Sequence, residues 1–163
     1  MTGRDERALL RMAAMDPAAA FARAKTLLES GGGILALRVA GLAAKELGRL
    51  EEGLAFLHRA LELASESDPY AAAQVRMNLV GLLTARGDVT EALANASRAE
   101  TVLCGLDADR LAANKACALA RAGRLDEAHD VAAGRPAPPP RGTRPRRAQR
   151  AADQSGSGAG VPR

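Results

Sequence analysis

Apolar residues follow helical spacing along most of the chain up to residue 134. They recur at intervals of three and four residues, which places them on one face of a helix. Glycine, proline and short polar stretches interrupt this pattern at intervals and divide the chain into segments. The pattern predicts helices over residues 4–15, 17–30, 34–47, 50–65, 69–86, 89–105, 107–122 and 125–133.

Three of the predicted turns have the same sequence pattern, built around Gly48, Gly87 and Gly123, which lie 39 and 36 residues apart. Each glycine is followed by a polar residue, an aliphatic residue, an acid at the fourth position and a small residue at the fifth. Glycine closes a helix in the left-handed conformation at least cost because it has no Cβ. The acids then fall in the first turn of the next helix, where negative charge is favoured.

Small residues also recur in register. Gly53, Ala92 and Ala128 follow the turn glycines by five residues, and Ala60 and Ala99 follow the first two glycines by twelve. Such residues allow two helices of a pair, or neighbouring pairs, to approach closely. Asp-Pro pairs at residues 16–17 and 68–69 predict an N-cap followed by the first helical residue. The sequence therefore predicts an all-α body made of repeated helix pairs.

The repeats resemble tetratricopeptide repeats in length, in the tight glycine turn and in the placement of small residues. The best copy is Ile34 to Leu63, with Gly41, Gly48, Gly53 and Ala60-Leu61-Glu62-Leu63. The second copy, about Ala73 to Val102, keeps Asn78-Leu79, Gly87-Asp88 and Glu91-Ala92-Leu93, and the third begins at Asp109. Of the family's aromatic positions, only that of Phe56 holds a ring.

The resemblance implies a right-handed α-solenoid of antiparallel helical hairpins. On this basis residues 1–33 form a degenerate N-terminal hairpin, residues 34–134 form the repeats, and residues 135–163 form a disordered tail rich in Pro, Arg and Gly. Aromatic residues make up only 2% of the chain, so the core must consist of Leu, Ala, Val and Met. That composition argues against a β-sandwich or barrel.

The net charge of +4 is unevenly distributed. Residues 135–163 contain seven arginines and one acid, whereas the rest of the chain carries 16 basic and 18 acidic residues. Six of the eight prolines also lie beyond residue 134. Such a segment cannot bury enough apolar surface to fold. The last predicted helix is about half as long as its counterpart at residues 50–65. We therefore expect the chain to be a truncated or frame-shifted piece of a longer reading frame. Its bias toward Ala and Arg suggests a bacterial genome.

The N-terminus carries acids and lacks the apolar core of a signal peptide, and no apolar run reaches the ~18 residues of a membrane span. We therefore expect a cytoplasmic protein without a membrane partner. Cys104 and Cys117 have no close-spaced partner, and we expect both to be buried as small hydrophobic residues.

Candidate chemistry is sparse. His58 and His129 have no Cys, His or acid at metal-ligand spacing. The run of glycines at residues 31–33 lacks the Lys and Ser or Thr of a phosphate loop, and predicts the end of a helix instead. We therefore expect no catalytic residue, cofactor or metal, and no enzymatic activity.

In this repeat family the first helix of each pair lines a concave groove that receives an extended peptide or a helix. Asn78 and Asn114 each precede a turn glycine by nine residues, and they resemble the family's asparagines that grip a peptide backbone. Arg38 and Arg110 fall on nearby turns and are suited to a carboxylate. These four residues are the predicted partner-binding site. The alternative is that both asparagines only bond neighbouring helices.

We therefore expect a non-enzymatic scaffold that binds a protein or peptide partner. The long-helix, alanine-rich style resembles the repeat region that precedes a caspase-like (CHAT-type) peptidase domain in large bacterial proteins, which implies a regulatory arm. Two alternatives remain: a nucleic-acid-associated regulator that uses the basic tail, or an unstable fragment. The sequence leaves the partner and the oligomeric state open.

Substitution Gly87→Val tests the predicted repeat register. A β-branched side chain at a left-handed helix cap should lower the free energy of unfolding by about 1–2 kcal/mol or more. Thermal unfolding followed by circular dichroism measures the effect. An unchanged melting temperature would show that the register is wrong.

Overall fold

The structure, a computed structural model, describes residues 3–64 and 68–134, and every regular element in these two ranges is an α-helix. The prediction of an all-α body is therefore confirmed. The predicted disordered tail, residues 135–163, lies outside the described residues. The helices are α1 (Gly3–Met15), α2 (Pro17–Glu29), α3 (Ile34–Glu46), α4 (Leu50–Ala64), α5 (Pro69–Arg86), α6 (Val89–Glu100), α7 (Gly105–Arg121) and α8 (Leu125–Ala132).

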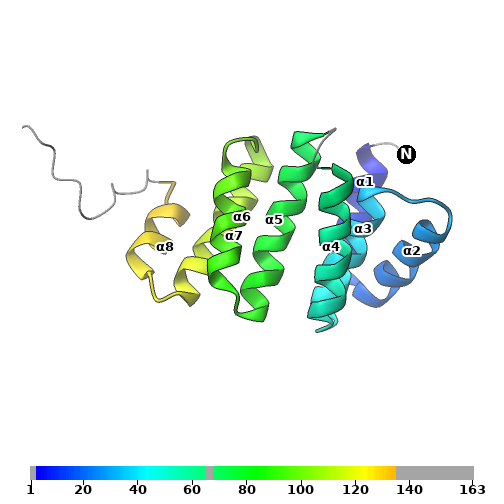
Figure 1. The fold of residues 1–163 in the computed structure, drawn as a ribbon, viewed down its shortest axis with the longest axis horizontal. Coiled ribbons are helices and arrows are strands. Elements are labelled where there is room, and N and C mark those ends of the chain that lie inside the picture. Colours follow the sequence, from blue (N-terminus) through cyan, green and yellow to red (C-terminus); the bar gives the residue numbers. More distant parts are fainter. Residues whose placement is uncertain (1–2, 65–67, 135–163) are drawn as a thin grey trace, which may run out of the picture.

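The helices form an elongated row, with the blue helices α1 and α2 at one end and the yellow α8 at the other (Figure 1). Consecutive helices pack against one another throughout the row. In addition, the odd-numbered helices contact one another in succession: α1 with α3, α3 with α5, and α5 with α7. The odd-numbered helices therefore form a row of their own along the molecule, which we call the inner row.

The three turn glycines adopt the predicted left-handed conformation, with φ angles of 73° at Gly48, 101° at Gly87 and 74° at Gly123. In each turn the amide after the glycine donates to a carbonyl five residues earlier, at 2.8 to 2.9 Å. This bond satisfies a carbonyl that the end of the helix leaves without a partner. The donor and acceptor pairs are Arg49 and Ala44, Asp88 and Leu83, and Arg124 and Leu119.

Both predicted Asp-Pro caps are confirmed. The carboxylate of Asp16 accepts from the amide of Ala19 at 3.0 Å, and that of Asp68 accepts from the amide of Ala71 at 2.9 Å. The proline that follows each aspartate occupies the first turn of its helix, where no amide partner is needed.

The connection between α6 and α7 differs from the prediction. Helix α6 ends at Glu100 instead of residue 105, and α7 begins at Gly105 instead of residue 107. Within this connection Leu103 lies in the core, where it is only 7% exposed. Gly105 then takes a φ of 56°, which allows the sharp return into α7.

Helices α3 and α4 meet through two opposed glycines. A Cβ on Gly41 would lie 2.6 Å from Cγ of Leu57, and a Cβ on Gly53 would lie 2.7 Å from Cδ1 of Leu82. Neither position has room for a larger residue. Ala60, Ala92 and Ala99 are fully buried, as the repeat pattern predicts.

An aromatic pair links the first two helices to the rest of the molecule. Phe21 of α2 and Phe56 of α4 pack edge to face with ring centroids 6.0 Å apart. They are the only phenylalanines in the sequence. The guanidinium of Arg49 lies over the ring of Phe21, 5.2 Å from its centroid.

Two helix glycines allow a matched test of the α3–α4 contact. Gly41→Ala should lower the free energy of unfolding by about 1–3 kcal/mol, because the new methyl group overlaps Leu57. The control is Gly81→Ala, where a Cβ would meet only Asn114 at an ordinary 3.7 Å. That variant should be neutral or more stable by up to about 1 kcal/mol, since alanine favours helix over glycine. Urea unfolding measures both, and equal midpoints would contradict the close approach of α3 and α4.

Candidate partner-binding groove

The four predicted site residues line one pocket of about 300 Å³ on the inner row of helices. Residues from α1, α3, α5 and α7 all contribute to its walls. The sequence therefore located residues that the fold brings together from three separate helix pairs. The lining residues are Leu10, Arg38, Leu42, Met77, Asn78, Arg110, Ala113 and Asn114.

A second pocket, of about 380 Å³, shares Leu10, Arg38 and Arg110 with the first and therefore adjoins it. We call the two pockets together the inner groove. The second pocket is more polar than the first. Its remaining lining residues are Glu6, Arg7, Tyr70, Gln74, Cys104, Leu106 and Asp107.

Arg38 is the most buried charge in the inner groove, with 4% of its surface exposed. Its Nε donates to Oδ1 of Asn78 at 3.1 Å, and its Nη1 donates to Oε1 of Gln74 at 2.7 Å and to Oε1 of Glu6 at 3.5 Å. Burial lowers the pKa of Arg38, and the negative charges of Glu6 and Asp107 oppose that shift. A guanidinium nevertheless stays charged in proteins, so this cation depends on its partners.

Asp107 is the second centre of the polar network. Its carboxylate accepts from the hydroxyl of Tyr70 at 3.1 Å, from Nε2 of Gln74 at 2.7 Å and from Nη1 of Arg110 at 3.4 Å. The hydrogen bond to Asp107 raises the pKa of Tyr70. Because Gln74 also contacts Arg38, hydrogen bonds run without interruption from α1 through α3 and α5 to α7.

The sequence prediction missed four members of this network: Glu6, Tyr70, Gln74 and Asp107. Their contacts join residues separated by 32, 36, 33 and 37 positions, which is close to one repeat length. Polar residues that recur at the repeat length on the first helix of each pair therefore indicate hydrogen bonds between successive first helices. The sequence prediction used that register only for asparagine.

Both asparagines bond neighbouring helices. Asn78 accepts from Arg38, and Nδ2 of Asn114 donates to the carbonyl of Met77 at 3.1 Å. The alternative stated for them from the sequence thus describes what they do within the chain. The amide nitrogen of Asn78 and the amide oxygen of Asn114 are not used in these bonds.

The rim of the inner groove carries exposed side chains. The side chain of Arg110 is 65% exposed, Leu106 is 75% exposed, and Arg7 is also exposed. Leu10 and Leu42 are partly buried at the floor. The groove thus combines apolar side chains with arginines, of which Arg38 contacts Glu6 and Arg110 contacts Asp107.

The prediction that the two cysteines are buried is wrong, because Cys104 and Cys117 are both exposed. Cys104 lies just before α7, outside the helix. Cys117 lies on α7 itself. This helix is the last of the inner row, and in the described residues no further odd-numbered helix packs against it. The two histidines are exposed. Within residues 3–64 and 68–134, no three His, Cys, Asp or Glu side chains are grouped so as to hold a metal ion.

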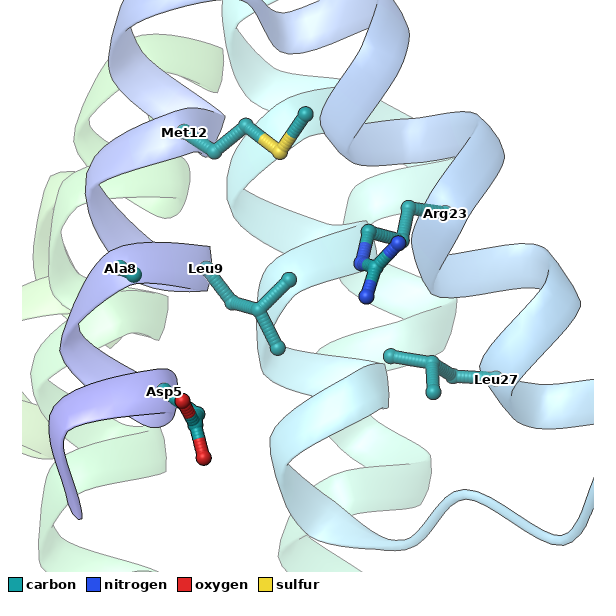
Figure 2. Close-up of a pocket in the computed structure, with 6 residues that line it drawn as sticks. All are labelled: Asp5, Ala8, Leu9, Met12, Arg23 and Leu27. Carbon is teal, nitrogen blue, oxygen red and sulfur yellow. The ribbon is translucent and has the colours of Figure 1, made fainter. Parts of the chain in front are cut away.

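A third pocket, of about 470 Å³, lies between α1 and α2 and outside the inner groove. Figure 2 shows Leu9 and Met12 of α1 and Arg23 and Leu27 of α2 projecting into the space between the two helices. Asp5 and Ala8 complete its lining. Residues 5–12 of α1 therefore border an open space on the α2 side of the helix.

Comparison of the chain with protein-family models, with curated proteins and with solved structures gave no match. In the part of the chain that the structure describes, no helix has the length and apolar character needed to cross a membrane.

Substitution Asn78→Ala tests the partner of the buried guanidinium. Loss of the acceptor leaves Nε of Arg38 unsatisfied in a buried position, so the free energy of unfolding should fall by about 1–3 kcal/mol. The control is Ser97→Ala, which removes an exposed hydroxyl that bonds only the carbonyl of Leu93 in its own helix, α6. That variant should change stability by about 0.5 kcal/mol or less. Urea unfolding distinguishes the two, and an equal effect would show that the bond to Arg38 does not stabilise the fold.

Proposed function

We propose that this chain is a non-catalytic interaction scaffold whose inner groove binds a peptide or helix of a partner protein. The observation that carries the proposal is that Arg38, Asn78, Arg110 and Asn114, selected from the sequence for partner binding, line one pocket. Residues from all four inner helices surround it, so an extended ligand would contact several repeats at once.

The order of helix contacts supports an α-solenoid of the tetratricopeptide type, for which the resemblance implies a right hand. In such a solenoid each first helix packs against the first helix of the next pair and against the second helix of the pair before it. Here α3 contacts both α1 and α2, and α7 contacts both α5 and α6. The inner row would then be the concave face, which such repeats use for binding.

The ligand is best suited to the groove if it combines apolar and acidic groups. Leu10 and Leu42 would accept its apolar side chains, and the exposed guanidinium of Arg110 would meet its negative charge. We place the scaffold in the cytoplasm and, following the style of its repeats, in a larger bacterial protease system of the CHAT type as a regulatory arm.

Selection of peptides from a displayed random library against the full chain tests this function. Peptides that bind the inner groove should lose affinity about tenfold or more on Arg110→Gln, because a charged hydrogen bond contributes about 1.5–3 kcal/mol. The matched control is Arg59→Gln, which removes an exposed arginine of α4 outside the groove. Fluorescence anisotropy with the selected peptides measures both affinities.

If Arg59→Gln lowered the affinity and Arg110→Gln did not, the peptides would bind outside the inner groove. Circular dichroism of both variants verifies that their helical content is that of the unchanged chain. The comparison then reports on the groove alone.

A further inference from the structure

The contact between Glu6 and Arg38 differs from the others in the network. It is the only carboxylate contact of Arg38 among the described residues, yet its Nη1 to Oε1 distance is 3.5 Å, against 2.7 Å to Gln74. The Glu6 side chain is 41% exposed, whereas that of Arg38 is 5% exposed. A carboxylate from solvent could therefore approach this position, while the guanidinium stays fixed.

Arg38 is held ready for such a carboxylate by its neutral partners. Asn78 fixes Nε and Gln74 fixes Nη1, both from α5. The hydrogen bonds described for Arg38 use only these two nitrogens, so Nη2 can donate to a ligand. A guanidinium binds a carboxylate best through two parallel bonds, which the single long contact of Glu6 does not provide.

Residues 5–8 of α1 contribute no buried side chain, and the buried residues Leu9 and Ala13 lie further along the helix. The pocket between α1 and α2 is lined on the α1 side by residues from Asp5 to Met12 (Figure 2). Glu6 therefore sits on a segment that has space on one side and the inner groove on the other.

We infer that Glu6 is an internal competitor for the inner groove, which a carboxylate of the partner must displace from Arg38. The inference rests on the proposed function and adds the regulation of the same site. Exchange of one carboxylate for another keeps the buried cation paired throughout, so displacement does not expose an uncompensated charge. Binding is then weakened by the cost of moving Glu6, and removal of that carboxylate should strengthen it.

The test uses the full chain and a fluorescent hexaglutamate peptide that is blocked at both ends. Variant Glu6→Gln should bind this peptide about tenfold more tightly than the unchanged chain. The matched control is Glu29→Gln, which removes the same charge from an exposed position at the end of α2 and should change the affinity less than twofold. A hexaglutamine peptide with a free C-terminus distinguishes a terminal carboxylate from acidic side chains as the source.

Adding Arg38→Met to Glu6→Gln should abolish the gain in affinity. If circular dichroism shows that the double variant is unfolded, hydrogen exchange of the unchanged chain replaces it. Peptide binding should then accelerate exchange in residues 5–10, where Glu6 is released. Equal affinities of Glu6→Gln and Glu29→Gln for both peptides would overturn the inference. A loss in Arg110→Gln with no gain in Glu6→Gln would reject the competitor and leave the proposed groove intact.

Discussion

The close approach of helix backbones is the constraint on which this structure depends. With two phenylalanines and no tryptophan in the whole chain, the core cannot be filled by large rings. The backbones must instead come together until small residues touch, as Gly41 and Gly53 do between α3 and α4. Such packing tolerates little change in side-chain volume, because the surrounding helices cannot move apart independently. The glycine turns support it by ending each helix at a fixed point.

Close packing also explains where polarity is concentrated. Most buried side chains are apolar. Arg38, the one buried cation among the described residues, lies on the inner row where partners from α1 and α5 can reach it. A buried ion pair adds little net stability, but removing one of its two partners destabilises the fold because the other charge stays buried and unpaired. The network therefore fixes how the inner helices align, and it does so on the same face that forms the groove.

Local features of the sequence predicted the helices of the body well. The caps at Asp16 and Asp68 and the turn glycines fixed most helix ends within one or two residues, because their effects are confined to one turn. The end of α6 was missed because Gly105, interpreted from the sequence as the end of that helix, begins α7 instead.

The site was predicted only in part, for a similar reason. Repeat register identified Asn78 and Asn114, but the partners of Arg38 come from other helices, and only the fold shows that Glu6 and Gln74 reach it. A further consequence concerns Tyr70, the only tyrosine of a chain without tryptophan. Its hydroxyl donates to Asp107 inside the groove. The tyrosine emission of the protein therefore arises from this one ring, and it reports on the inner groove without any added label.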